Sequence, residues 1–135
     1  MADLCAITGI GLRQQDEQGH FVLVLEDDHE RTLLINIGFC EAKAIQMVLD
    51  KETFPRPLTH DLFTAMVEQL NVSILRVIID DFSHKTFFSR LLINSPDGQV
   101  SLDCRPSDGI ALALRVQAPV LVSEMVMTAA QRPKK

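Results

Sequence analysis

Short apolar runs separated by turn residues fill the first third of the chain. Residues 4–13 alternate weakly, 20–26 form an apolar run, and a similar run follows at 31–37 after the turn 27–30. Runs of this length, rich in Ile, Leu and Val and bounded by turn residues, are typical of β-strands. The pattern therefore predicts three strands, and the last two form a hairpin.

Two helices are predicted next. In residues 41–51 the apolar positions recur at helical spacing, and Glu41 lies in the first turn, where the positive end of the helix dipole favours a carboxylate. After a loop with two prolines, Thr59 is a good N-cap for a helix that runs to about residue 71. The apolar face predicted for this second helix consists of Leu62, Phe63, Met66, Val67 and Leu70.

The strand pattern returns after the second helix. One strand is predicted over 72–80, and a hairpin joins 85–94 to 99–104 through a Ser-Pro-Asp-Gly turn. Ser107 is the predicted N-cap of a third helix, and a short strand, PVLV, leads into a brief last helix capped by Ser123.

This return of the pattern indicates an internal duplication. We predict a single domain over residues 1–131 with an α+β fold, in which a β-β-β-α unit spans about 4–50 and its copy about 72–117. The helix at 59–71 links the copies, the sheet is antiparallel or mixed with helices packed against it, and residues 132–135 form a flexible tail. The alternative is that two unrelated strand-to-helix segments share a similar pattern. The positions that align without a gap are Ile35, Ile37, Ile45, Met47 and Leu49 with Val100, Leu102, Ile110, Leu112 and Leu114.

Composition narrows the class of protein. The chain has 135 residues, 47% of them hydrophobic, and 7 Phe but no Tyr or Trp, which excludes long aromatic platforms for stacking single-stranded bases. A net charge of −5 argues against nonspecific coating of nucleic acid, so a nucleic-acid partner would need a local basic patch. No apolar stretch reaches the roughly 20 residues of a membrane span, and the N-terminus lacks a signal-peptide pattern. We expect a cytoplasmic protein without membrane contact.

The cysteines and the acidic turn are expected to be structural. Cys5, Cys40 and Cys104 are widely spaced and include no CxxC pair, so we expect reduced thiols and no zinc site. A thiol-dependent enzyme that uses Cys40 or Cys104 is the alternative. The acidic run at 26–30 does not have the spacing of a calcium loop and is expected to be a solvated hairpin tip.

The segment around the second helix start carries the first candidate site. Arg56, Thr59, His60 and Asp61 surround the free backbone N–H groups of a helix N-terminus, and this combination can bind an anion. The more ordinary interpretation is a well-capped helix, in which Thr59 caps, Asp61 complements the dipole and His60 is solvated.

Two further helix starts carry similar groups. Arg105 can present its planar guanidinium to a phosphate, while Ser107 and nearby N–H groups contact another oxygen. In the ordinary interpretation Ser107 caps, Asp108 complements the dipole, and Arg105 pairs with Asp103 or Glu41. If the two repeats pack about a pseudo-twofold axis, the helix starts at Glu41, Thr59 and Ser107 face one cleft.

Longer phrases of the sequence resemble a known family. IGFCEAKAI, RPLTHDL, DCRPSDGIALALR and APVLVSE occur in the order found in the bifunctional nuclease domain family, and the similarity runs from about Leu4 to Met127. Gly109 stands where the family more often has Ala, which is expected to loosen that helix by up to about 1 kcal/mol. Met125 stands where a second acidic residue is usual.

The resemblance implies cleavage of both RNA and DNA, a compact α+β fold with an internal repeat, and homo-oligomers, from a homodimer upward. We expect no organic cofactor. The motif positions carried over to this chain are Glu41, Arg56, Thr59, His60, Asp61, Arg105, Ser107 and Asp108.

Cleavage of DNA restricts the chemistry, because DNA has no 2′-hydroxyl to act as nucleophile; water must attack, activated by a base or a metal. His60 is the preferred base because its ordinary pKa lies near neutrality, and Arg56 and Arg105 would stabilise charge on the phosphoryl oxygens. Glu41, Asp61 and Asp108 either orient the histidine or hold Mg²⁺ or Mn²⁺. The rival hypothesis is a noncatalytic scaffold that binds an anion or a protein.

Overall fold

The computed structural model describes residues 3–131, so the predicted tail at 132–135 lies outside the described residues. One sheet of seven strands and four helices make up this part of the chain. The fold is therefore α+β, as predicted. The elements in chain order are β1 (Leu4–Gln14), β2 (Phe21–Asp27), β3 (Thr32–Ile37), α1 (Phe39–Leu49), α2 (Thr59–Gln69), β4 (Ser73–Ser83), β5 (Thr86–Ser95), β6 (Gly98–Cys104), α3 (Pro106–Val116), β7 (Val120–Ser123) and α4 (Glu124–Ala130).

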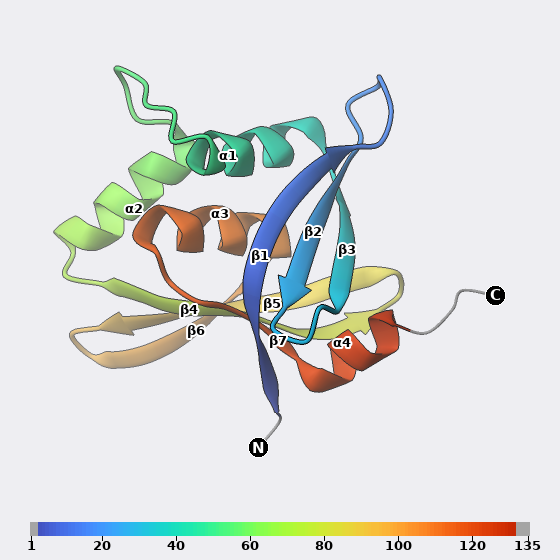
Figure 1. Ribbon diagram of the computed structural model, residues 1–135. Coiled ribbons are helices and arrows are strands. Elements are labelled where there is room, and N and C mark those ends of the chain that lie inside the picture. Colours follow the sequence, from blue (N-terminus) through green and yellow to red (C-terminus); the bar gives the residue numbers. More distant parts are fainter. Residues whose placement is uncertain (1–2, 132–135) are drawn as a thin grey trace.

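The sheet joins two groups of three strands through one short strand. The strand order is β3-β2-β1-β7-β4-β5-β6, and every neighbouring pair is antiparallel except β4 and β7. The first residues of β1, Leu4–Ala6, pair with β7, whereas from Ile7 onward the strand pairs with β2. Figure 1 shows β1, β2 and β3 standing upright, while β4, β5 and β6 run across the base of the molecule.

Both predicted hairpins are present. In β2 and β3, Leu25 lies opposite Leu33 and Leu23 opposite Ile35, and all four side chains are buried. Alternate residues of a strand face the same side of the sheet, so the apolar run produces one buried face. The second hairpin pairs β5 with β6 from Ser89 opposite Cys104 to the turn.

Each half of the chain contains three antiparallel strands followed by a helix, β1–β3 with α1 and β4–β6 with α3. This element order is the one that a duplication would produce, and the duplication itself stays a prediction. No helix among residues 3–131 combines the length and the hydropathy that crossing a bilayer requires.

The helix α3 forms the centre of the core. Its residues from Pro106 to Ala113 are almost all buried, and Figure 1 shows it between the two groups of strands with α1 and α2 beside it. The helix α4 lies apart from these three and packs against β3, β4 and β7. Because α3 touches both helices and strands, the residues at its N-terminus are held from several sides.

Gly109 allows this close packing, which corrects the expectation that it only loosens the helix. A Cβ atom at this position would lie 2.5 Å from Cγ2 of Val77 in β4 and 3.1 Å from Sγ of Cys104. Overpacking of this kind typically costs about 1–3 kcal/mol, more than the ~1 kcal/mol that alanine gains in helix propensity. Glycine therefore lets α3 lie directly against the sheet.

Two predicted N-caps are wrong. The helix α2 has Leu58 as its N-cap and Thr59 as its first helical residue, because the backbone bonds of the helix begin at the carbonyl of Leu58. The helix α3 has Arg105 as its N-cap, because Pro106 occupies the first helical position, where its fixed φ and missing N–H are favourable. Ser123, in contrast, caps α4 as predicted, and its Oγ accepts a hydrogen bond from the N–H of Val126 at 3.2 Å.

The predicted apolar face of α2 is divided between two environments. Phe63 and Val67 are partly buried, whereas Leu62, Met66 and Leu70 are exposed. The helix covers the edge of α3 with a narrow stripe and is open to solvent elsewhere.

Candidate active site

Residues from the starts of two helices, α1 and α3, hold one arginine. The guanidinium of Arg105 donates from Nε to Oδ2 of Asp108 at 2.8 Å, from Nη2 to Oδ1 of Asp108 at 3.2 Å, and from Nη1 to Oε1 of Glu41 at 3.0 Å. Glu41 comes from α1, and Asp108 from the first turn of α3. Arg105 lies at the end of β6 with its side chain 63% exposed. Two of its five N–H groups remain for a further acceptor.

His60 from α2 joins the same cluster. Its Nε2 atom lies 3.1 Å from Oδ1 of Asp108. An ionised carboxylate only accepts hydrogen bonds, so this contact places the imidazole proton on Nε2 and leaves the lone pair on Nδ1. Within residues 3–131, Nδ1 of His60 forms no hydrogen bond. Asp108 thus fixes a tautomer in which Nδ1 is free to accept a proton.

The charges of the cluster hold Asp108 in its ionised form. Burial works to raise the pKa of Asp108, but hydrogen bonds from Arg105 and His60 outweigh it and keep that pKa below its ordinary value. The hydrogen bond to Asp108 and the charge of Asp108 raise the pKa of Arg105, and Glu41 adds to the shift. The cluster therefore contains a permanent cation, an ionised carboxylate and a histidine within hydrogen-bond reach of one another.

The cluster borders a pocket of about 640 Å³. Three helices and two strands form its walls, and His60, Arg105 and Asp108 are among its lining residues. The pocket has the size of sites that bind small molecules. Its other lining residues are Cys40, Lys43, Ala44, Met47, Leu58, Thr59, Phe63, Leu91, Leu102, Asp103, Cys104, Leu112 and Arg115.

Asp61 does not join the cluster but holds a second arginine. Its Oδ1 atom accepts from Nε of Arg115 at 2.8 Å, and its Oδ2 atom accepts from the backbone N–H of Leu58 at 3.1 Å. Burial opposes ionisation of Asp61, but these two hydrogen bonds outweigh it, so its pKa lies below its ordinary value. Arg115 also donates to the carbonyls of Ala44 and Ala111, and it lines the pocket. Arg115 was not among the predicted site residues; it lies in the last turn of α3, after a run of apolar residues.

The other predicted substrate-binding residues, Arg56, Thr59 and Ser107, differ in their exposure and in whether they line the pocket. Thr59 is exposed and lines the pocket. Arg56 is exposed in the loop before α2 and does not line the pocket. Ser107 is 5% exposed and likewise lies outside the pocket lining.

Two cysteines border the pocket as well. Cys40 is exposed, and Cys104 is partly buried, where burial raises the pKa of its thiol. A raised pKa reduces the thiolate fraction at neutral pH, so the environment of Cys104 is unsuited to a nucleophile.

The predicted carboxylates do not form a metal-ligand group. Between residues 3 and 131, the only set of three or more metal-ligating side chains with donor atoms within 4.8 Å of one another is Asp27, Asp28 and His29. Asp27 is buried, and its Oδ1 atom already accepts from the backbone N–H groups of His29 and Arg31 at 2.9 Å. Those bonds close the turn between β2 and β3, so the acidic run is a hairpin turn as predicted, but Asp27 is buried in it and not solvated.

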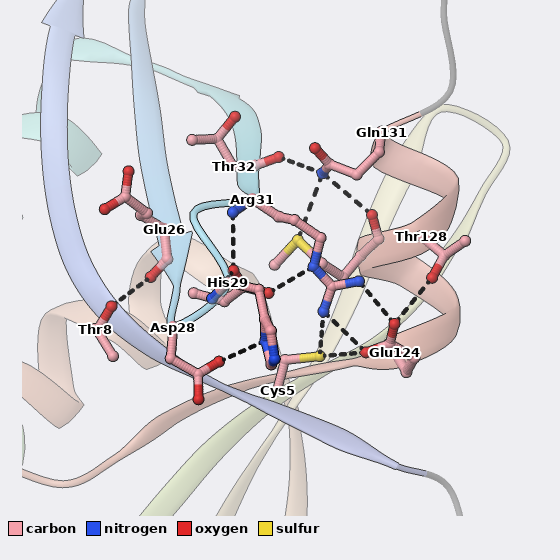
Figure 2. Close-up of polar contacts among 12 residues, drawn as sticks. Cys5, Thr8, Glu26, Asp28, His29, Arg31, Thr32, Glu124, Thr128 and Gln131 are labelled. Atoms are coloured by element: carbon pink, nitrogen blue, oxygen red, sulfur yellow. Dashed lines mark hydrogen bonds and ion pairs between the residues drawn. The ribbon is translucent and has the colours of Figure 1, made fainter.

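A second arginine cluster lies at the far end of the sheet. Arg31 donates to Oδ2 of Asp27 at 2.8 Å, to Oε1 and Oε2 of Glu124 at 2.7 and 3.0 Å, and to Sγ of Cys5 at 3.3 Å. The Cys5 thiol in turn donates to Glu124 at 2.8 Å. Figure 2 shows the Arg31 guanidinium in contact with Glu124 and Cys5, with Thr128 on the outer side of Glu124. These contacts tie β1 and the β2–β3 turn to α4.

Comparison with known proteins gives a consistent family assignment. The model of the bifunctional nuclease domain matches residues 22–135. An uncharacterized protein of Mycobacterium tuberculosis is 38% identical over 122 residues, which cover 90% of this chain and 73% of the relative.

The plant relatives are more distant and much longer than the matched region. Bifunctional nuclease 1 of Oryza sativa subsp. japonica is 29% identical over 120 residues, 85% of this chain and 36% of the relative. Bifunctional nuclease 1 of Arabidopsis thaliana is 25% identical over 114 residues, 81% of this chain and 35% of the relative. This chain thus corresponds to about a third of each plant protein.

Proposed function

The chain belongs to the bifunctional nuclease domain family, and we propose that it is a nuclease that hydrolyses phosphodiester bonds in both RNA and DNA. The observation that carries the proposal is the hydrogen-bonded set of His60, Asp108 and Arg105 at the border of a pocket. Such a set combines a base with a cation that can bind phosphate, as hydrolysis of a phosphodiester requires.

Water is the proposed nucleophile, because a mechanism shared by RNA and DNA cannot depend on the 2′-hydroxyl. Nδ1 of His60 accepts a proton from the water as its oxygen attacks the phosphorus. The bond between phosphorus and the leaving sugar oxygen breaks, and that oxygen takes up a proton from solvent, which leaves one end with a phosphate and the other with a hydroxyl. The His60 imidazolium then returns its proton to solvent. Asp108 acts as a positioning residue, because it holds Nε2 and stabilises the imidazolium that forms.

Arg105 is proposed to bind the scissile phosphate. Its side chain is 63% exposed, and the two N–H groups without a partner among residues 3–131 can donate to the phosphoryl oxygens while Glu41 and Asp108 keep the guanidinium in place. Glu41 is thus a positioning residue for Arg105. Asp61 has the same role for Arg115.

The remaining motif residues contribute at the periphery. The hydroxyl of Thr59 is proposed to contact substrate in the pocket, and Arg56 is proposed to contact a phosphate farther along the strand. Ser107 is buried, so we propose no direct substrate contact for it.

A divalent cation, Mg²⁺ or Mn²⁺, is the alternative way to activate water. Glu41 and Asp108 are the carboxylates that contact Arg105, but its guanidinium already bridges them, and within residues 3–131 they belong to no three-ligand group. The donor set therefore does not fit a metal, and the mechanism above contains no step through one.

Hydrolysis is tested by titrating highly purified protein against labelled single-stranded RNA and DNA. The control is the double variant Arg105→Ala plus His60→Ala, prepared identically, since a contaminating nuclease would persist in it. We expect both substrates to be cleaved by the wild type and neither by the double variant. Binding without cleavage would favour the alternative of a noncatalytic scaffold, for which the mutually satisfied ion pairs of Glu41, Arg105 and Asp108 would serve to hold helices together.

We further propose that the protein acts in the cytoplasm as a homo-oligomer. Support for self-association comes from the open sheet edges at β3 and β6 and from the exposed apolar side chains of α2. Light scattering coupled to size-exclusion chromatography tests this proposal, and a monomeric mass at micromolar concentration would contradict it.

A further inference from the structure

The pocket beside Arg105 is larger than binding of a phosphate group requires. Its volume of about 640 Å³ is in the range of pockets that enclose most of a drug-sized molecule. Arg105 and His60 occupy only part of its lining. Another part of the ligand would fill the remaining space.

The lining separates into an apolar floor and a charged border. Met47, Leu91 and Leu112 are each at most 5% exposed, and Phe63 is partly buried beside them. The cationic side chains of the lining are Lys43, Arg105 and Arg115, so a phosphate is expected beside one of them. A charged group placed against Met47, Leu91 and Leu112 alone would lose its hydration without gaining a partner. The group that enters the floor must be uncharged and largely apolar.

A nucleobase meets both conditions and is already attached to the phosphate. We propose that this floor, defined by Met47, Phe63, Leu91, Leu102 and Leu112, binds one unpaired nucleobase while the adjoining phosphate lies at Arg105. The inference rests on the proposed nuclease function and adds its substrate class, which is single-stranded or unpaired nucleic acid. A base inside a duplex is stacked and paired, and would have to leave the helix to reach the floor.

The chemistry of the floor also explains how one site can accept different bases and sugars. Apolar side chains contact the face of a base and do not read the hydrogen-bonding edge that distinguishes one base from another. No contact in this arrangement involves the 2′-hydroxyl. We therefore expect little base preference and similar recognition of RNA and DNA.

Binding of mononucleotides tests the base pocket separately from hydrolysis. AMP and dAMP, with ribose 5-phosphate as the ligand that lacks a base, are titrated into the wild-type protein by calorimetry. We expect the two nucleotides to bind at least about tenfold more tightly than ribose 5-phosphate, because even one methylene in a hydrophobic pocket is worth about 10- to 200-fold in discrimination.

Two positions on β6 provide matched variants. Leu102 is 39% exposed and lines the pocket, whereas Val100 is 42% exposed and does not. They are two residues apart and thus on the same face of the strand. Leu102→Ser and Val100→Ser add no charge, so neither alters the attraction for phosphate. We expect Leu102→Ser to weaken nucleotide binding several-fold, with Val100→Ser and all ribose 5-phosphate affinities unchanged.

Cleavage of a single strand is then compared with cleavage of a blunt duplex of the same sequence. Faster cleavage of the single strand, reduced by Leu102→Ser but not by Val100→Ser, supports the base pocket. Equal affinity for AMP and ribose 5-phosphate, or equal rates on single strand and duplex, overturns it even if the protein is a nuclease. Preferential binding of AMP without cleavage of any nucleic acid supports the pocket and rejects the nuclease function.

Discussion

The protein holds two arginines in similar ways and in very different surroundings. Arg105 lies between Glu41 and Asp108, and Arg31 lies between Asp27 and Glu124. The side chain of Arg31 is 25% exposed and forms four hydrogen bonds, including one to a buried thiol. That of Arg105 is 63% exposed and forms three.

The two clusters differ in the polar atoms and the space that they leave available to a ligand. The Arg105 cluster adds a histidine with an unoccupied nitrogen and borders a pocket, whereas the Arg31 cluster joins β1 to α4 and borders none of the lining described above. An arginine between two carboxylates is thus by itself a structural element. Spare donors, a neighbouring histidine and adjacent space are what make one suited to catalysis.

The largest expected effect is on turnover after removal of the histidine. His60→Ala should lower the hydrolysis of both RNA and DNA by roughly 10²- to 10⁴-fold, the usual contribution of a general base, with the melting temperature nearly unchanged. His20→Ala is the matched control, because Nδ1 of His20 also contacts a carboxylate, that of Asp16 at 2.7 Å, on an exposed turn away from the pocket. Initial rates on labelled oligonucleotides measure the difference. Equal rates for the two folded variants would remove His60 from the mechanism.

Replacing each of the two arginines by alanine in turn gives the second test. Arg105→Ala should lower turnover by about 10²- to 10³-fold, comparable to the loss of one donor to a developing anion, and should alter stability little because the pair is exposed. Arg31→Ala should do the opposite: it leaves the buried carboxylate of Asp27 without its cation, lowers the melting temperature and spares turnover per folded molecule. Thermal unfolding and single-turnover rates on both variants separate the effects. A loss of turnover in a fully folded Arg31→Ala protein would abolish the distinction between the clusters.

Acid should weaken the Arg31 cluster in a defined pH window. Hydrogen bonds from Arg31 and then from Cys5 lower the pKa of Glu124 from 4.5 to about 2. A carboxyl whose pKa is lower in the folded state stabilises the fold above its unfolded pKa, and that stability is lost as the pH falls from about 4.5 toward 2. Urea unfolding of wild type and Glu124→Gln should therefore differ most near neutral pH and converge in acid. A difference that does not change with pH would contradict this assignment.

The smallest expected effect is that of a chelator. Because Arg105 occupies the space between the site carboxylates, EDTA should change the rate of hydrolysis by less than about twofold. The assay is the same oligonucleotide cleavage after dialysis, with and without added Mg²⁺ or Mn²⁺. Loss of activity that Mg²⁺ or Mn²⁺ restores would replace the proposed mechanism with a metal-dependent one.

The strands and helices could be predicted largely because their signals are local. Alternation and helical spacing identify β2, β3 and α3 within a few residues, and the turn chemistry identifies both hairpins. The caps at Thr59 and Ser107 were wrong because a preference worth about 1 kcal/mol yields to neighbouring constraints such as Pro106. The role of Gly109 was missed because it depends on Val77, a residue far away in the sequence.

Most residues of the candidate site could be predicted from the sequence, but their arrangement could not. The helix starts at Glu41, Thr59 and Ser107 were expected to face one cleft; they are linked through His60, Asp108 and Arg105, but Glu41 and Ser107 do not line the pocket. The pairing of Arg105 with Glu41 was the ordinary alternative. The pocket floor and Arg115 were not predicted, because a pocket is formed by residues from five elements and leaves no local pattern. Which carboxylate faces the histidine likewise depends on how α2 packs on α3.

The strand β7 also imposes an order on folding. Leu4 pairs with Ser123, and Val77 pairs with Val120, so the two groups of strands meet only through a segment that is synthesised after both. Each hairpin can form early from local contacts, but the long-range pairing closes a loop of more than a hundred residues and is correspondingly slow. During synthesis on the ribosome, the inner edges of β1 and β4 therefore stay open until β7 emerges, and this interval is when the chain is most exposed to aggregation.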